Sequence, residues 1–365
     1  MTGTTIGLLV IMGIYLTAMV IIGISFSFKN KNIGDFYLGG RKLGPLVTAM
    51  SAEASDMSSW LLMGLPGVAY LTGIADAGWT AIGLAIGTYL NWLIVAKRLR
   101  SYSVKANNSI TLPDFFSNRY RDKSKALLAI SAILIVIFFV PYTASGFAAC
   151  GKLFSTLFDV PYLPAMIVSA VIIVAYTALG GFLAASTTDL IQSIVMTLAL
   201  IIVVVFGINT AGGLDAVIEN ASSLEGFTTM FATHDPTTGA AVPYNGLKIA
   251  STLAWGLGYF GMPHILLRFM GIQDENKLKL SRRIASVWVV ISMFIAIFIG
   301  IIGYSMTKAG AIEALAGSES EKLIIKIAML ISNHGVLAII MAGLILAGIL
   351  ACTMSTSDSQ LLAAS

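Results

Sequence analysis

A short polar stretch between two apolar runs sets the tightest limit on what this chain can fold into. Residues 51–60 contain Glu53, Asp56 and four serines, and apolar residues flank them on both sides. An ionisable group in a membrane helix costs about 2.5–3.5 kcal/mol on insertion scales, so it is kept where a cation or a polar solute interacts with it. In a soluble protein the same residues would form an ordinary helix N-cap. The composition decides between these two interpretations.

The composition indicates an integral membrane protein. Hydrophobic residues make up 57% of the chain and charged residues 11%, with a mean hydropathy of +0.88, whereas soluble domains contain roughly 25% charged residues. No charged residue precedes Lys29, so the first apolar run lacks the positive region of a signal peptide and is predicted to be a retained helix. Cys150 and Cys352 show no pairing or metal-ligand spacing, and we expect them to be small core residues.

Nine apolar runs are long enough to cross a bilayer, which takes about 20 residues. Their approximate bounds are 6–28, 46–72, 77–96, 126–154, 161–182, 188–212, 248–270, 284–309 and 335–362. A shorter amphipathic piece, residues 318–332, is predicted to be an interfacial helix on the outer face. The chain is therefore predicted to be an all-α polytopic membrane protein.

The positions of Lys and Arg predict which segment ends face the cytoplasm. When the segments alternate, 17 of the 22 basic residues fall on one side, in residues 29–42, 97–125 and 268–283. The loop 213–247, on the other side, contains no Lys or Arg. It carries the acidic residues Asp215, Glu219, Glu225 and Asp235. This asymmetry predicts an outside N-terminus and cytoplasmic basic loops.

Two of the nine segments carry residues that interrupt a helix. The second contains the polar stretch, and the seventh has three glycines and Pro263 between residues 254 and 264, which disfavour a continuous helix. Interrupted segments five helices apart predict two inverted repeats with a solute site near the membrane midplane. The first repeat would cover about 46–212 and the second would begin at about 248. On this count the chain is expected to be C-terminally incomplete, because the second repeat stops after its third helix.

Several motifs, in their order along the chain, resemble those of the sodium/solute symporter family. They are residues 38–41, 51–67, 111–116, 180–184 with Thr188 and Asp189, 255–261, 263–264 and 354–356. The resemblance extends over essentially the whole chain and is strongest to the bacterial branch that carries proline. It implies a LeuT-like fold of 13 helices, of which residues 1–365 would form the first nine as one transporter domain, in the plasma membrane of a bacterium.

The resemblance implies sodium-coupled import of L-proline by alternating access, with Na+ as the coupling ion. The sequence itself has no nucleophile–base pair, metal-ligand cluster or phosphate-binding loop, so neither an enzyme nor a nucleic-acid partner is expected. Three alternatives stay open. The chain could be a sodium symporter for another small solute, such as a different amino acid, pantothenate or a sugar. It could be the membrane solute-sensing part of a signalling protein, or a product of this length could be inactive.

The sodium site is expected where two segments offer oxygen atoms. Sodium prefers oxygen ligands, and a broken helix supplies carbonyls that lack helical hydrogen bonds. By the resemblance, the ligands are the carbonyls of Ala54, Met57 and Cys352 and the hydroxyls of Ser355 and Thr356. The adjacent hydroxyls of Ser355 and Thr356 are also unusual by themselves deep in an apolar segment, and the alternative is that each bonds to a carbonyl one turn earlier.

Four residues are expected to couple sodium to transport. By the resemblance, Asp56 shapes the electrostatics of the sodium site, and Ser58 is its polar neighbour. Asp189 is expected to open the sixth helix, either as an N-cap carboxylate or as part of the ion pathway. Arg41 is either a positive-inside anchor or a gate for sodium release. Glu53 is open between a vestibule residue and a ligand.

The solute site must suit a zwitterion with an apolar ring. Such a ligand needs polar partners for its two charged groups and apolar walls for its ring. By the resemblance, the lining residues are Trp60, Tyr142, Trp255, Tyr259 and Pro263. Trp255 and Tyr259 lie one turn apart inside the interrupted segment, where residues of an interfacial aromatic belt would be misplaced.

Overall fold

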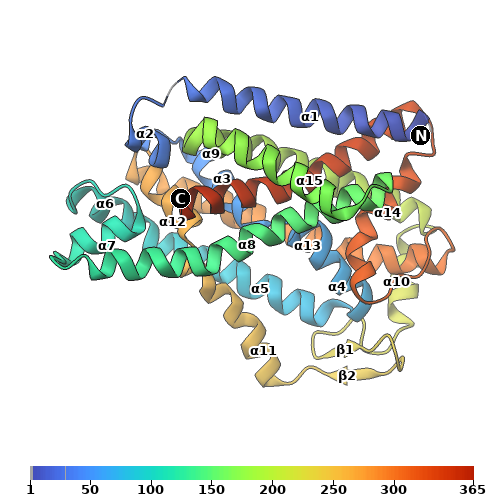
Figure 1. The fold of residues 1–365 in the computed structure, drawn as a ribbon. Coiled ribbons are helices and arrows are strands. Elements are labelled where there is room, and N and C mark those ends of the chain that lie inside the picture. The colour runs from blue at the N-terminus through green and yellow to red at the C-terminus, as the bar shows by residue number, and fades with distance from the viewer. Residues whose placement is uncertain (1–2, 29) are drawn as a thin grey trace.

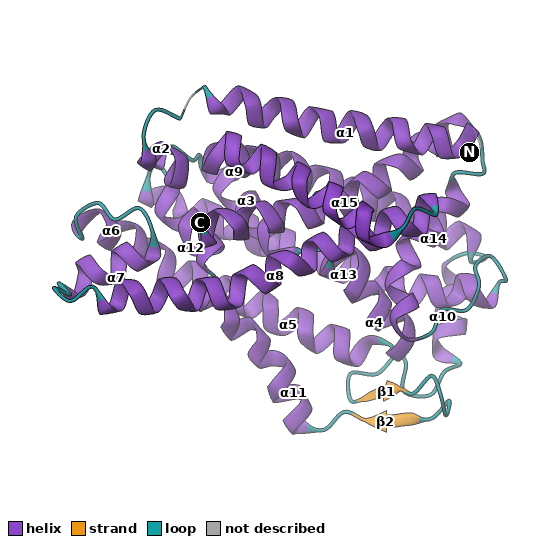
Figure 2. Cartoon of the chain, viewed as in Figure 1, coloured by secondary structure: helices purple, strands orange, loops and turns teal. Residues whose placement is uncertain are grey.

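The computed structural model describes residues 3–28 and 30–365 as a bundle of helices with one small hairpin (Figures 1 and 2). Lys29, one of the basic residues used to predict orientation, lies outside the described residues. The uninterrupted long helices are α1 (Gly3–Ser27), α8 (Ala126–Phe158), α13 (Leu278–Lys308) and α15 (Val336–Ala364). All nine predicted segments are helical, at bounds close to those expected from the apolar runs.

Helix α9 (Tyr162–Thr210) contains two of the predicted segments. Its 49 residues are broken at Gly181, whose φ of 62° and ψ of −160° lie outside the helical region. Glycine adopts this conformation without the steric cost that a Cβ brings. The chain therefore reverses there and returns, and α9 supplies the fifth and sixth segments of the prediction.

The two predicted interruptions are both present. Helix α3 (Pro45–Met57) ends before Ser58, which has a φ of 47°, and a π-helical stretch η2 (Trp60–Gly64) leads into α4 (Leu65–Thr72). In the seventh segment, α11 (Gly246–Leu253) passes into the 3-10 helix η4 (Ala254–Gly261) before α12 (Pro263–Gly271) begins. Pro263 is the first residue of α12, where a backbone N–H would have no partner within the helix, so the N–H that proline lacks is not missed.

Helix α15 lies at the centre of the bundle, in contact with α9, α8, α1 and α3. Figure 1 shows α1 along one edge of the bundle, above α9 and α15. Helix α5 (Ile74–Asn91) continues through η3 (Trp92–Ala96) into α6 (Lys97–Lys105) and is crossed by η4. This arrangement brings the two interrupted segments close to α15 and α5.

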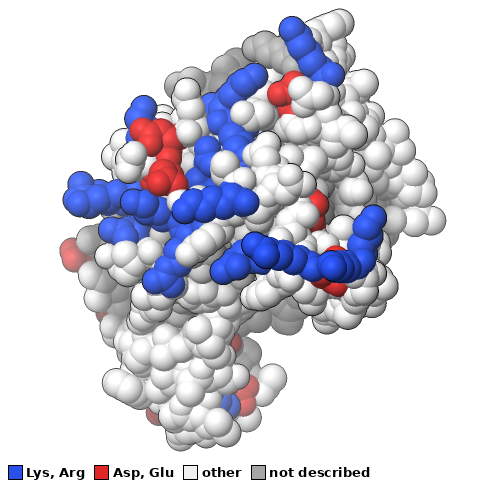
Figure 3. Space-filling view, turned by 90° about the vertical axis from the view of Figure 1, so that its left-hand side faces the viewer, with Lys and Arg blue, Asp and Glu red and all other residues white. Residues whose placement is uncertain are grey.

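The bundle has two chemically different ends. One, called the basic end here, is formed by η1 (Gly39–Arg41), α2 (Ile33–Leu38), α6 and α7 (Leu112–Tyr120). Figure 3 shows Lys and Arg side chains gathered on this face. The other, called the hairpin end, carries α10 (Leu214–Ser222), α14 (Leu323–Ile331) and the antiparallel strands β1 (Ala232–His234) and β2 (Ala241–Pro243). The separation of charge agrees with the alternation of the predicted segments.

The hairpin end differs in two details from the sequence-based expectation. The strand pair was not predicted; its turn is held by Asp235, whose hydrogen bonds from Thr237 and Thr238 lower the pKa of this carboxyl to about 2. Residues 318–332 form η6 (Gly317–Lys322) and α14, but the apolar face of α14 is buried against α15, α9 and α4. The apolar face of the helix that was expected to lie at the membrane interface therefore packs against other helices of the bundle.

Candidate functional site

The end of α3 and the middle of α15 meet at the residues predicted to bind sodium. The Ser355 hydroxyl donates to the Ala54 carbonyl at 2.8 Å and lies 3.1 Å from the Cys352 carbonyl. The Thr356 hydroxyl lies 3.3 Å from the same Cys352 carbonyl. Four of the five predicted ligands therefore form one buried cluster of oxygen atoms. Local back-bonding, the alternative interpretation, describes Thr356, whereas Ser355 also reaches across to α3.

Met57, the fifth predicted ligand, is the last residue of α3. The Leu61 amide donates to the Ser58 carbonyl at 3.4 Å, three residues back, so regular helical bonding stops at this point. Met57 lines the adjoining cavity. The thiol of Cys352 contacts the Ser58 carbonyl. Both the side chain and the backbone carbonyl of Cys352 therefore lie against the interruption that follows α3.

A cavity of about 50 Å³ adjoins this cluster. Its lining residues are Asp56, Met57, Ser58, Trp60, Leu84, Tyr142, Trp255, Tyr259 and Met262. Four of the five residues predicted to line the solute site are among them. The Trp60 and Trp255 rings lie 5.3 Å apart, centroid to centroid, on one wall. Pro263 does not line this cavity; it begins α12 directly after Met262 and lines a separate pocket at the basic end.

The cavity contains polar groups that suit a zwitterion. The Trp60 indole nitrogen is buried and forms no hydrogen bond with the described residues, whereas the Tyr259 hydroxyl lies beside the Asp56 carboxylate. Buried polar groups are nearly always hydrogen-bonded, so the Trp60 indole is a donor available to a ligand. The Asp56 carboxylate lines the same cavity. A donor for a carboxylate and an acceptor for an ammonium group are thus present together.

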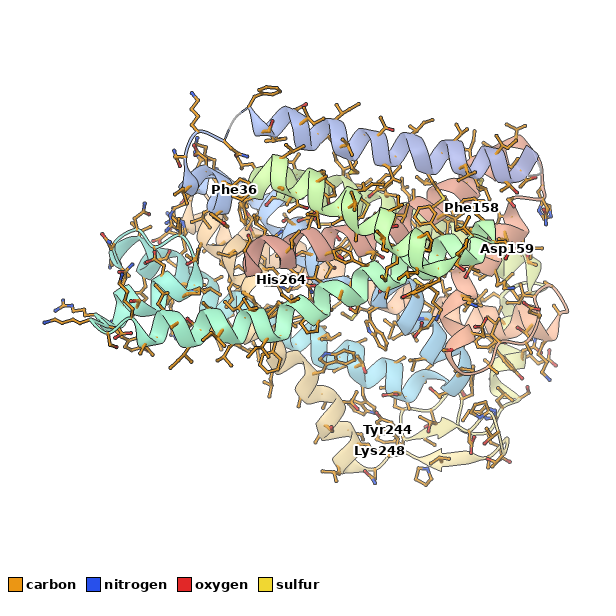
Figure 4. All side chains as sticks on the ribbon, in the orientation of Figure 1. Phe36, Phe158, Asp159, Tyr244, Lys248 and His264 are labelled. Carbon is orange, nitrogen blue, oxygen red and sulfur yellow. The ribbon has the colours of Figure 1, made fainter. Side chains whose placement is uncertain are left out.

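A wider vestibule of about 570 Å³ shares Ser58, Trp60, Tyr142, Trp255 and Met262 with the small cavity. Its rim includes Lys152 of α8 and Glu321 of η6, whose charged groups form an ion pair at 2.6 Å. These rim residues belong to the hairpin-end half of the bundle, where α8 finishes at Phe158 and Asp159 (Figure 4). The small cavity is therefore approached from the hairpin end.

Asp189 is not an N-cap residue, which corrects the expectation that it opens a helix. The second half of α9 begins after Gly181, so Asp189 lies in its interior. The Asp189 carboxylate accepts from the Ser51 hydroxyl at 2.6 Å and from the Arg268 guanidinium at 3.1 Å. Both partners of this ion pair are fully buried. The N-cap alternative is wrong, and a role in the ion pathway stays a prediction.

Arg268 is a residue that the sequence analysis misplaced. It was counted with the basic loop 268–283, but it lies in α12 with no exposed surface. Its guanidinium also contacts Ser359 of α15, and Asp358 accepts from Ser359 and from the Tyr176 hydroxyl. Because Arg268 directly follows an apolar run, the hydropathy pattern around it is the one expected for an arginine anchored in the headgroup region. Burial of Arg268 could have been inferred from the two interrupted segments, because they are expected to pack against each other around a common site.

Arg41 joins three parts of the basic end. Its guanidinium donates to the Met270 carbonyl at 2.6 Å, to the Ser109 carbonyl at 2.9 Å, and to Ser103 and Asn108 side chains at 3.1 Å. Burial of the guanidinium and the neighbouring Arg100 lower the pKa of Arg41 to about 10, which leaves it charged at neutral pH. These bonds go beyond a simple positive-inside anchor, and the gating role stays a prediction.

Two further polar residues are buried near the site. Glu53 accepts a hydrogen bond from the Trp92 indole nitrogen at 3.0 Å and does not line the cavity or the vestibule described above. His264 lies inside the bundle (Figure 4), 5.7 Å from the Phe139 ring, and neither of its nitrogens has a hydrogen-bond partner among the described residues.

Known proteins resemble this chain in sequence and in fold. The family model described as "Sodium:solute symporter family" matches residues 36–365. The sodium/proline symporter of Haemophilus influenzae is 44% identical over 358 residues, which cover 96% of this chain and 68% of that protein. The sodium/proline symporter of Escherichia coli is 40% identical over 367 residues, which cover 98% of this chain and 68% of that protein.

A solved structure has the same arrangement of helices. It is the substrate-bound outward-open state of a Na+-coupled sialic acid symporter, with a TM-score of 0.81 over 97% of this chain and 72% of that one. At 17% identity this likeness shows the fold, which is LeuT-like. Together with the family match, it makes the chain a multi-pass, sodium-coupled membrane transporter and not an enzyme. The chain belongs to the sodium:solute symporter family.

Proposed function

We propose that this protein imports L-proline together with Na+ by alternating access. The observation that carries the proposal is the position of the small cavity. It combines the unpartnered indole donor of Trp60 with the Tyr259 hydroxyl and the Asp56 carboxylate, and it adjoins the oxygen cluster of Ala54 and Ser355. The names of the relatives, sodium/proline symporters at 40–44% identity, supply the substrate.

Each predicted site residue has a proposed role in this scheme. Sodium is bound by the carbonyls of Ala54, Met57 and Cys352 and the hydroxyls of Ser355 and Thr356. The proline ring packs against Trp60, Tyr142 and Trp255, while Tyr259 and the Trp60 indole donate to its carboxylate. Asp56 and Ser58 connect the two sites electrostatically, and Pro263 fixes the start of α12 beside the pocket. Arg41 and Asp189 act on the release of sodium at the basic end.

The proposed orientation places the basic end in the cytoplasm and the N-terminus outside, in the plasma membrane of a bacterium. The support is the excess of Lys and Arg at the basic end, which follows the positive-inside rule, and the bacterial relatives. The vestibule then opens to the outside. The repeats are proposed to comprise about residues 46–212 and the part of the chain from about 248.

One sodium ion is sufficient to drive the uptake. Moving one charge down about 100 mV gains about 2.3 kcal/mol, and a tenfold sodium gradient adds about 1.4 kcal/mol. The sum of roughly 3.7 kcal/mol supports accumulation on the order of 500-fold at one-to-one coupling. The bound sodium ion also holds α3 and α15 together, because oxygen atoms of both helices coordinate it.

The test is uptake of labelled proline into membrane vesicles with and without an inward sodium gradient. We expect uptake that requires sodium and that unlabelled proline competes away. Competition by another amino acid, pantothenate or a sugar at lower concentration would replace proline by that solute. Binding without sodium-driven accumulation would favour the solute-sensing alternative and overturn the import function.

A further inference from the structure

We propose that Arg268 is a positioning residue of the transport cycle. Its guanidinium holds α12 to α3, α9 and α15 on the cytoplasmic side of the sodium site, and these contacts must separate before the ion and the solute leave inward. The proposal rests on the transport function and orientation proposed above. It assigns to one buried side chain the closure of the inner end.

The contacts of Arg268 reach three other helices, α3, α9 and α15. The Arg268 Nε donates to the Ser51 hydroxyl of α3 at 2.9 Å, and its Nη2 donates to the Asp189 carboxylate of α9 at 3.1 Å. The same Nη2 contacts Ser359 of α15, and its Nη1 donates to the His264 carbonyl of its own helix at 2.8 Å. A lysine offers a single ammonium group and could not reproduce this planar fork of donors.

The cluster lies between the sodium ligands and the basic end. Ser51 is one turn before Ala54 in α3, which enters the bundle from the basic end. Ser359 is one turn after Ser355 in α15, which finishes at the basic end. On both helices, therefore, the Arg268 contacts stand about one turn, or about 5.4 Å, inward of the ligands. An ion released toward the cytoplasm must pass this point.

The surroundings of Arg268 leave little room for partial opening. Arg268, Asp189, Ser51 and Ser359 have no exposed surface, whereas the vestibule at the other end has a volume of about 570 Å³. A buried charge is tolerated only while it is paired and hydrogen-bonded. Separation of Arg268 from Asp189 therefore requires water to enter from the cytoplasmic side, which links breakage of the pair to inward opening.

Cys352 offers a native reporter for this opening. It is fully buried beside the sodium ligands, and a buried thiol reacts slowly. In a Cys150→Ala background, Cys352 is the single thiol of the sequence. Its labelling by a membrane-impermeant maleimide in inside-out vesicles measures access from the cytoplasmic side, whether or not proline is the substrate.

The variants are Arg268→Lys and the double variant Asp189→Asn with Arg268→Gln. The double variant removes one charge of each sign, so that neither member of the Arg268–Asp189 pair stays buried without the other. We expect both to label about tenfold faster than the parent from the cytoplasmic side, and the KM for external proline to rise by a similar factor, because the outward-facing population falls. The control, Lys152→Gln with Glu321→Gln, breaks the ion pair at the vestibule rim and should not raise cytoplasmic labelling.

The outcomes separate closure of the inner end from a purely structural role. Folded Arg268 variants that label at the parent rate would overturn the proposal, since Arg268 would then serve packing alone. If labelling rises while no solute shows sodium-driven uptake, the inner closure stands and the import function is wrong.

Discussion

Ser355 donates a hydrogen bond to the Ala54 carbonyl at 2.8 Å, which joins two helices at positions 301 residues apart in the chain. The carbonyl belongs to the last turn of α3, just before the chain leaves the helical conformation at Ser58. A sodium ion between these atoms would take both oxygens as ligands, and the hydroxyl hydrogen would turn away. The bond therefore marks a contact between α3 and α15 that the ion is expected to strengthen.

The first prediction concerns the two hydroxyls of this cluster. Replacing Ser355 and Thr356 together by Ala removes two oxygen ligands, and we expect the sodium concentration for half-maximal uptake to rise by at least about tenfold, as for disturbed metal sites in general. Uptake measured against sodium concentration tests this. Ser357→Ala is the matched control, because the Ser357 hydroxyl is buried without a partner among the described residues. Unchanged sodium dependence in the double variant would contradict the proposed ligand set.

The second prediction concerns the donors in the small cavity. Tyr259→Phe keeps the ring and removes the hydroxyl, and a hydrogen bond to a charged group contributes about 1.5–3 kcal/mol. We therefore expect the KM for proline to rise by about tenfold or more. Tyr120→Phe, at an exposed position of α7, is the control and should behave as the parent. A Tyr259→Phe variant with the parental KM would remove this hydroxyl from the solute site.

The third prediction contrasts two ion pairs. Asp189 and Arg268 are fully buried, whereas the side chains of Lys152 and Glu321 are 26% and 45% exposed. Removing one partner of a buried pair costs about 3–5 kcal/mol, and an exposed pair contributes about 0–1 kcal/mol. Asp189→Asn should thus lower the free energy of unfolding far more than Glu321→Gln. High salt should reduce the loss caused by Glu321→Gln and leave the loss caused by Asp189→Asn unchanged. Equal losses in thermal unfolding would refute this ranking.

The sequence predicted the fold well because hydropathy and helix-breaking residues act locally. The nine segments, the interruption after Met57 and the one before Pro263 all follow from residues within a turn or two of each other. The position of a given residue along its helix was harder to predict. The chain reverses at Gly181, earlier than expected, and this moves Asp189 from a helix end into the interior.

Contacts between distant helices explain what the sequence left out of the site. Arg268, Asp358 and Tyr176 meet only because α12, α15 and α9 pack together. A hydropathy pattern cannot distinguish a buried arginine at the end of an apolar run from one that lies in the headgroup region. The meeting of the Ala54, Cys352, Ser355 and Thr356 oxygen atoms was predicted because the family motifs carry these residues. The local pattern contributed only the adjacent hydroxyls of Ser355 and Thr356, and sodium binding there stays a prediction.

The last prediction concerns the crossing of η4 over α5, which supports the pocket wall of Trp255 and Tyr259. A Cβ added to Gly256 would lie 1.9 Å from the Gly83 carbonyl oxygen, whereas a Cβ added to Gly258 would meet no atom within 4 Å. Backbone atoms cannot yield as a flexible side chain can, so Gly256→Ala should push η4 away from α5 and cost at least about 1–3 kcal/mol. We expect this variant to unfold at lower temperature and to lose proline uptake, while Gly258→Ala keeps both. Parental behaviour of Gly256→Ala would mean that the two helices do not cross at this distance.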